Sequence, residues 1–181
     1  KLNDVFLFLF YFFYLVNTHV HADHITGSGK IKTILNSVKS VISANSKAKA
    51  DIHLNDGDKL EFGNQHIIAL TTPGHTDGCM SYVWHEGNAV FTGDALLIRG
   101  CGRTDFQQGN PGRLYDMVHS KLFTLPDHYL VFPAHDYHGQ MVSSIAEEKK
   151  HNPRLTKSKE EYIHIMNNLN LAHPRMIDVA V

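Results

Sequence analysis

The stretch HVHADH, residues 19–24, places four potential metal ligands within six residues, directly after an apolar run that ends at residue 16. Side chains at alternate positions of an extended segment point to the same side, so His19 and His21 are expected to converge on one ion. Asp23 and His24 face a neighbouring position after the chain turns. A lone histidine carries little information, but four ligands at this spacing predict a metal site.

Three further metal-competent side chains stand later in the chain, each directly after an apolar run that is typical of a strand. His75 follows a Pro-Gly pair that ends its strand, Asp94 follows a glycine, and His135 follows Pro-Ala. Burying an aspartate at such a point is costly without a cation or hydrogen-bond donors. Together with the first cluster, these residues give four successive strand ends that carry a ligand, which predicts one site along the edge of a sheet.

The remainder of the chain alternates between predicted strands and helices, without an internal repeat after residue 16. Apolar and β-branched runs predict strands over residues 14–16, 40–43, 59–62, 65–72, 79–84, 89–92 and 129–132. Apolar residues at helical spacing predict helices over residues 26–38, 112–123, 141–150 and 158–169. This mixture predicts an α/β or α+β layered domain whose chemistry lies where strands end.

The composition is that of one globular domain. The 181 residues, 43% hydrophobic and 19% charged, are enough for a single core. Lys+Arg and Asp+Glu number 17 and 18, giving a formal net charge of -1, so we expect neither nucleic acid nor a membrane as partner. The chain has two cysteines, Cys79 and Cys101, which excludes a disulfide framework, whereas its 14 histidines favour metal chemistry.

The beginning of the chain differs from the rest, because residues 5–16 form an uncharged run rich in phenylalanine, tyrosine and leucine. The run is too short for a membrane-spanning helix, which needs about 20 residues. No small-residue cleavage site follows it, which argues against a signal peptide. We therefore divide the chain into a Phe-rich apolar leader, residues 1–14, whose structure the sequence leaves open, and a domain over residues 15–181.

The ordered motifs His-x-His-x-Asp-His, Gly-His, Gly-Asp and Ala-His resemble those of the metallo-β-lactamase superfamily. The resemblance covers residues 15–181 and implies an αββα sandwich with its metals at one edge. Within the superfamily, residues 17–29, 92–109, 133–139 and 152–155 are most similar to the animal mitochondrial persulfide dioxygenase family. Members of that family have further strands before the first metal motif, so we expect leading strands of the first sheet to be missing or replaced here.

The resemblance implies one Fe(II) per chain, held by His19, His75 and Asp94, with zinc as the alternative metal. Four further residues would orient the ligands and water, or hold a second metal as in hydrolytic relatives: His21, Asp23, His24 and His135. The implied partners are glutathione persulfide and O2, which react with water to give sulfite and glutathione in sulfide catabolism. The resemblance also implies a mitochondrial matrix location, although no targeting segment is visible, and leaves a homodimer open.

The anionic glutathione portion needs a fixed cation, and the candidate is Arg103, with Tyr137 as a hydrogen-bond partner. In the alternative interpretation, Arg103 pairs with Asp105 and shapes the loop after the metal-binding aspartate. Arg99 is equally charged, and a structural ion pair is its alternative role. Two other functions stay open: a glyoxalase-II-like binuclear thioester hydrolase, and a non-catalytic, metal-binding remnant of a truncated gene.

Overall fold

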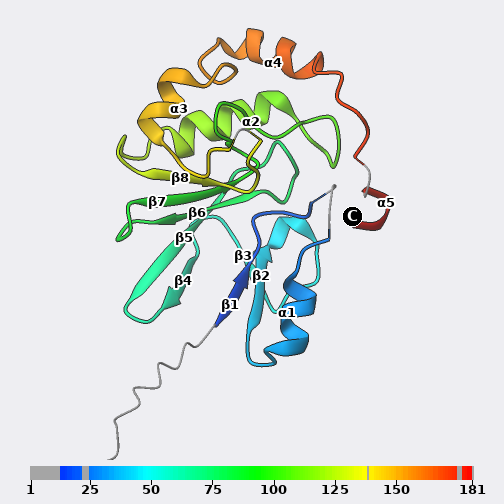
Figure 1. Cartoon of the computed structure of the whole chain (residues 1–181), viewed down its shortest axis with the longest axis vertical. Coiled ribbons are helices and arrows are strands. Elements are labelled where there is room, and N and C mark those ends of the chain that lie inside the picture. The colour runs from blue at the N-terminus through cyan, green and yellow to red at the C-terminus, as the bar shows by residue number, and fades with distance from the viewer. Residues whose placement is uncertain (1–12, 22–24, 138, 175–176, 181) are drawn as a thin grey trace, which may run out of the picture.

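The computed structural model describes residues 13–21, 25–137, 139–174 and 177–180, and within these it forms two sheets flanked by helices (Figure 1). The smaller sheet is parallel, with the order β1-β2-β3. Its strands are β1 (Tyr14–Val16), β2 (Lys39–Ser43) and β3 (Ile52–Leu54). Helix α1 (Ser28–Ile34) connects β1 to β2 and a short 3-10 turn, Ala44–Ser46, follows β2.

The larger sheet has six strands in sequence order. These are β4 (Lys59–Phe62), β5 (Gln65–Thr71), β6 (Met80–Trp84), β7 (Ala89–Gly93), β8 (Leu130–Pro133) and β9 (Ser143–Ser144). Neighbouring strands are antiparallel except β7 and β8, which are parallel and pair Ala89 with Leu130. A parallel pair requires a long crossover connection, and here the crossover contains a loop beside the predicted metal ligands and then a helix.

Helices α2 (Pro111–Met117), α3 (Ile145–His151) and α4 (Lys159–Asn167) lie on the side of the larger sheet that faces away from the smaller sheet, and α5 (Ile177–Ala180) lies beyond the ends of the strands (Figure 1). A π-helical turn over Val118–Leu122 continues α2. The side chains of Asn110, Ser144 and Ser158 accept hydrogen bonds from backbone N–H groups in the first turns of α2, α3 and α4. No helix in the described part of the chain is both long and apolar enough to cross a membrane.

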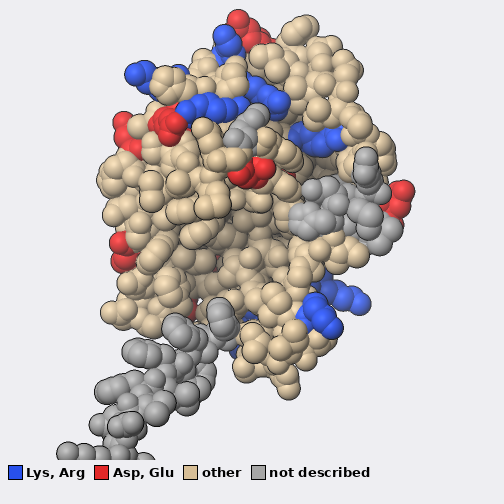
Figure 2. All heavy atoms as spheres, viewed as in Figure 1, with Lys and Arg blue, Asp and Glu red and all other residues tan. Residues whose placement is uncertain are grey.

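Two apolar clusters hold the layers together. One lies between the larger sheet and the helices and includes Val90, Leu96 and Leu114. The other lies between the two sheets and includes Val41 and Met80. The layer order is therefore helices, sheet, sheet and α1, which confirms the αββα sandwich expected from the resemblance. On the face shown in Figure 2, charged side chains gather mainly at the top, over the helical layer.

All seven predicted strands are present within one or two residues of their expected bounds. The sequence pattern missed β3 and β9, which have three and two residues and are too short to show a period. The predicted helix over residues 26–38 is shorter in the structure, where α1 covers Ser28–Ile34. Ile34 is 68% exposed, and α1 buries none of its residues.

Candidate metal centre

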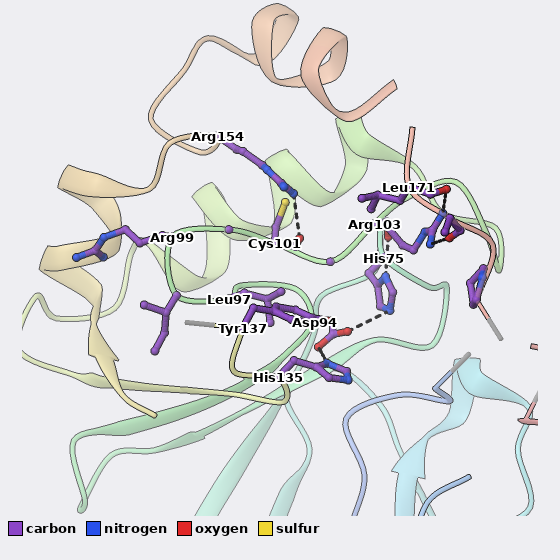
Figure 3. Close-up of a pocket in the computed structure, with 15 residues that line it drawn as sticks. His75, Asp94, Leu97, Arg99, Cys101, Arg103, His135, Tyr137, Arg154 and Leu171 are labelled. Carbon is purple, nitrogen blue, oxygen red and sulfur yellow. Dashed lines mark hydrogen bonds and ion pairs between the residues drawn. The ribbon is translucent and has the colours of Figure 1, made fainter. Parts of the chain in front are cut away.

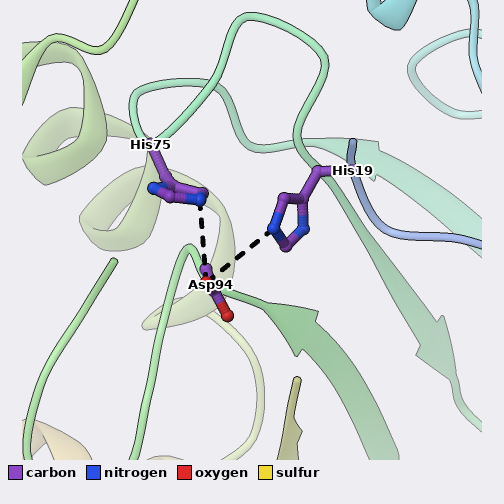
Figure 4. Close-up of side chains that lie close together, drawn as sticks. All are labelled: His19, His75 and Asp94. Atoms are coloured by element: carbon purple, nitrogen blue, oxygen red, sulfur yellow. Dashed lines mark ion pairs between the residues drawn. The ribbon is translucent and has the colours of Figure 1, made fainter. Parts of the chain in front are cut away.

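Three side chains from three separate strand ends converge at one point (Figure 4). Each of His19, His75 and Asp94 offers one ligand atom, and these atoms lie within 4.8 Å of one another. Oδ2 of Asp94 is 3.8 Å from Nε2 of His19 and 3.6 Å from Nε2 of His75. These separations are too long for hydrogen bonds. They suit atoms that each lie about 2.1 Å from one shared ion.

The other ring nitrogen of each histidine is already engaged. Nδ1 of His75 donates to the backbone carbonyl of Arg103 at 2.6 Å. A carbonyl only accepts, so this contact places the proton on Nδ1 and leaves the lone pair of Nε2 for a metal. Nδ1 of His19 lies 3.0 Å from the hydroxyl of Thr18, which likewise leaves Nε2 directed at the centre. Both rings are held in the orientation that a metal ligand needs.

The two oxygens of the Asp94 carboxylate face different residues. Its Oδ1 accepts a hydrogen bond from Nδ1 of His135 at 2.7 Å, and its Oδ2 faces the two ligand histidines. Burial would raise the pKa of Asp94, but the hydrogen bond from His135 and the neighbouring imidazoles lower it to about 2. Burial also lowers the pKa of His19, to about 3. Near neutral pH, the site therefore presents a carboxylate and a neutral imidazole, the forms that bind metals.

The site fits a metal ion by a further observation. Nε2 of His19 is buried and has no hydrogen-bond partner in the part of the chain that the structure describes. An unsatisfied buried ring nitrogen is costly, and a cation at the centre would remove that cost. Two imidazoles and one carboxylate, with one imidazole nitrogen otherwise unpartnered, together fit a metal-binding site.

The structure brings two further predicted residues next to the three ligands. The ring of His21 lies 4.0 Å from the ring of His19 and 5.6 Å from the ring of His135, measured between centroids. Asp23 and His24 lie outside the described residues. His21 and His135 therefore lie beside the three candidate ligands, and their role in orienting these ligands or holding a second metal stays a prediction.

Close approaches of the backbone bring the strand ends together. Gly93, the last residue of β7, has a φ of 56°, and a Cβ there would lie 2.7 Å from the Thr18 side chain. Only glycine combines this conformation with this contact. The contact joins the segment before Asp94 to the segment before His19. The prediction of a single sheet edge is wrong in one respect, because His19 follows β1 of the smaller sheet and the site bridges both sheets.

A cavity of about 510 Å³ opens beside His75, Asp94 and His135 (Figure 3). One wall is the loop over residues 97–103 and another is the segment over residues 171–174. Ligand pockets of this size commonly hold a small organic molecule. The cavity therefore opens directly onto His75 and Asp94, two of the three candidate ligands.

Arg103 lines this cavity, but most of its donors are already engaged. Its guanidinium forms a two-pronged ion pair with Asp105, at 2.7 Å for both contacts. It also donates to the carbonyls of Ala172 at 2.7 Å and Leu171 at 3.4 Å. The structure thus contains the pairing with Asp105 that the sequence left open as the alternative. Substrate binding by Arg103 stays a prediction.

Two other arginines near the cavity differ sharply in their surroundings. Arg99 pairs with Glu147 and Glu148, which matches the structural ion pair considered for it. Arg154 also lines the cavity, and its Nη1 donates to the carbonyl of Cys101 at 3.3 Å. No carboxylate among the described residues pairs with Arg154. Sequence reasoning missed this residue, although it stands in the Asn-Pro-Arg-Leu stretch at residues 152–155.

Tyr137 lies at the mouth of the cavity, with 69% of its surface exposed. Its ring stacks on that of His135, with centroids 5.6 Å apart and planes inclined by 9°. Cys101 also lines the cavity but is buried, and burial raises the pKa of its thiol. Burial therefore favours a packing role for Cys101.

We predict that Arg103→Lys lowers stability and weakens substrate binding together. Lysine keeps the charge but loses the planar fork, so contacts to the carbonyls of residues 171 and 172 are lost. Losing two hydrogen bonds costs about 1 to 3 kcal/mol. Metal content should be unchanged, because the backbone carbonyl that orients His75 remains. The melting temperature and the KM for the substrate test this prediction. If both equal those of the unmodified chain, the segment over residues 171–174 is held by other contacts.

Comparison with known proteins places these features in context. Residues 14–135 match the Metallo-beta-lactamase superfamily. The chain is 56% identical to the mitochondrial persulfide dioxygenase ETHE1 of Homo sapiens, over 93% of this chain and 66% of that protein. It is 34% identical to a hydroxyacylglutathione hydrolase of Bartonella tribocorum, over 82% of this chain and 58% of that protein.

A solved structure, the crystal structure of ETHE1 from Myxococcus xanthus, is also similar. Its TM-score is 0.89 at 53% identity, covering 93% of this chain and 74% of that one. The chain thus spans about two thirds of the length of the curated persulfide dioxygenases that it matches.

Proposed function

This chain belongs to the Metallo-beta-lactamase superfamily, and from its three metal ligands we propose that it is an iron-dependent persulfide dioxygenase. The observation that carries the proposal is the convergence of His19, His75 and Asp94 on one point. Two histidines and one carboxylate are the ligand set that non-haem Fe(II) oxygenases use, because it leaves positions open for substrate and oxygen. The identity to the Homo sapiens persulfide dioxygenase supports the same conclusion.

The proposed reaction joins glutathione persulfide, O2 and water to give glutathione, sulfite and two protons. The terminal sulfur is oxidised and O2 is reduced, and the bond between the two sulfurs breaks. Fe(II), when bound, would supply the one site at which both substrates meet. The chain itself would hold the carboxylate of Asp94 through His135, fix the ring of His75 through the Arg103 carbonyl, and enclose the substrate in the cavity.

Arg154 is the cation that we assign to the anionic glutathione portion. It lines the cavity and lacks a carboxylate partner among the described residues, whereas Arg99 and Arg103 are both paired. A guanidinium offers a planar fork that matches a carboxylate. Its place on the same cavity as His75 would let it orient the substrate with the persulfide directed at the metal centre.

We predict that Arg154→Gln raises KM for glutathione persulfide by about tenfold to a hundredfold, the usual loss for a charge-assisted hydrogen bond. Iron content and kcat should change little, because Arg154 is not among the ligands. The matched control is Arg113→Gln, which removes an exposed arginine paired with Asp77 away from the cavity. Equal KM values for the two variants would remove Arg154 from the substrate site.

The decisive test is to load the purified protein anaerobically with Fe(II), add glutathione persulfide, and measure oxygen consumption and sulfite. We expect about one iron per chain and turnover that yields sulfite. Two tightly bound zinc ions with thioester hydrolysis would support the hydrolase instead. Metal binding without either activity would support the non-catalytic alternative.

The Homo sapiens relative is a mitochondrial persulfide dioxygenase, and we propose the same compartment for this protein. From the sequence resemblance, we further propose that the protein lies in the mitochondrial matrix. Expression of the tagged protein in animal cells, followed by protease protection of isolated mitochondria, tests both levels.

A further inference from the structure

Glu148 on α3 is a fully buried carboxylate that the metal centre does not use. Its two oxygens accept four hydrogen bonds. Oε2 accepts from the backbone N–H of Arg99 at 2.9 Å and from Nδ2 of Asn152 at 3.0 Å. Oε1 accepts from Nη1 of Arg99 at 2.6 Å and from the hydroxyl of Ser143 at 2.7 Å. Such complete pairing offsets the cost of burying the charge and fixes the carboxylate in one position.

These bonds hold a loop in a conformation that it would not otherwise favour. Arg99 has a φ of 57°, a left-handed conformation that is unfavourable for a residue with a Cβ. Glu148 binds both the backbone and the side chain of this residue. Asn152 extends the anchor by one residue, because its Nδ2 also donates to the carbonyl of Gly100 at 3.0 Å. Residues 99 and 100 are therefore fixed to α3.

The same loop then reaches two metal ligands. The backbone N–H of Gly102 donates to the carbonyl of Asp94 at 2.6 Å. The carbonyl of Arg103 accepts the Nδ1 proton of His75 at 2.6 Å. A shift of the loop would move both the carbonyl of Arg103 and the N–H group of Gly102. The loop thus contacts the ring of His75 and the backbone of Asp94 through one hydrogen bond each.

We propose that Glu148 is a positioning residue for the metal centre, acting through residues 99–103 on the ring of His75 and the backbone of Asp94. The inference rests on the metal-ligand role of these two residues in the proposed function. It does not depend on which substrate the protein oxidises.

Glu147 provides the matched control. It neighbours Glu148 on the same helix and also pairs with Arg99, but its side chain is 43% exposed and only Glu148 of the two binds the Arg99 backbone. Glu147→Gln and Glu148→Gln therefore remove the same charge beside the same arginine. Each oxygen of Glu148 accepts hydrogen bonds from two donors. Only Glu148→Gln therefore places an amide NH2 group, itself a donor, against two other donors.

The experiment titrates both variants and the unmodified chain with Co(II), and records affinity, the visible absorption of bound Co(II) and the melting temperature of the metal-free protein. We expect Glu148→Gln to weaken Co(II) binding by about tenfold to a hundredfold, the usual effect of a residue that orients a ligand, and to change the absorption bands. Glu147→Gln should leave both unchanged.

A merely structural role would lower the melting temperature of Glu148→Gln without altering Co(II) affinity or absorption, and that result would overturn the proposal. If Glu148→Gln does not fold, Ser143→Ala removes a single hydrogen bond to the same carboxylate and should shift affinity and absorption in the same direction. An unaltered Co(II) site in a folded Ser143→Ala would then overturn it. Failure of the proposed function would look different, since Co(II) would bind normally and the iron-loaded protein would not consume oxygen.

Discussion

Asp94→Asn should abolish tight metal binding while leaving the fold in place. An amide is neutral and a much poorer ligand than a carboxylate, so we expect metal affinity to fall by at least about a hundredfold. The side chain keeps its volume, and its Oδ1 can still accept from His135, so the surrounding structure should persist. Metal content after dialysis against a weak chelator, together with circular dichroism, measures the two effects separately.

The control for this variant is Asp127→Asn, which exchanges an aspartate that is paired with Lys149 on the surface. Its side chain is 68% exposed, so its metal content and melting temperature should equal those of the unmodified protein. Unchanged metal content in Asp94→Asn would remove this residue from the ligand set and with it the proposed iron site.

Gly102→Ala should disrupt the metal centre through one added methyl group. A Cβ at this position would lie 2.7 Å from the carbonyl oxygen of Asp94 and 2.8 Å from the ring of His75. Because its φ is not in the left-handed region, the clash alone causes the effect. Overpacking of this kind costs about 1 to 3 kcal/mol, and the displaced atoms here belong to two metal ligands. We therefore expect lower stability together with at least about tenfold weaker metal binding.

Gly100→Ala is the matched control, because it adds the same methyl group to the same loop. Its nearest neighbour would be Cβ of Leu97 at 4.0 Å, an ordinary contact. Melting temperature and Co(II) affinity should therefore stay close to those of the unmodified chain. Equal effects of the two exchanges would mean that general loop stiffness, and not the approach of Gly102 to the ligands, sets the metal affinity.

The sequence pattern indicated a set of candidate ligands that includes His19, His75 and Asp94, because each is a polar residue shortly after an apolar run, and the family resemblance singled out these three. That pattern needs no knowledge of distant contacts, since burying such a side chain at a strand end already calls for a cation or a donor. The sequence pattern located the helix α1 but left open how far its apolar face is buried. Apolar spacing shows which face of a helix is apolar, but only the neighbouring layers decide whether that face is covered.

The sequence by itself thus determined seven of the nine described strands, a layered fold and the residues able to hold a metal, because these follow from local periodicity and residue chemistry. The tertiary structure alone decided that the site joins both sheets, that Arg103 is engaged while Arg154 lacks a carboxylate partner among the described residues, and that Glu148 anchors the wall loop. Glu148 and Arg99 are 49 positions apart, and their contact depends on a left-handed backbone. Charge alone does not reveal such a partner, because pairing between distant residues is set by how the layers pack.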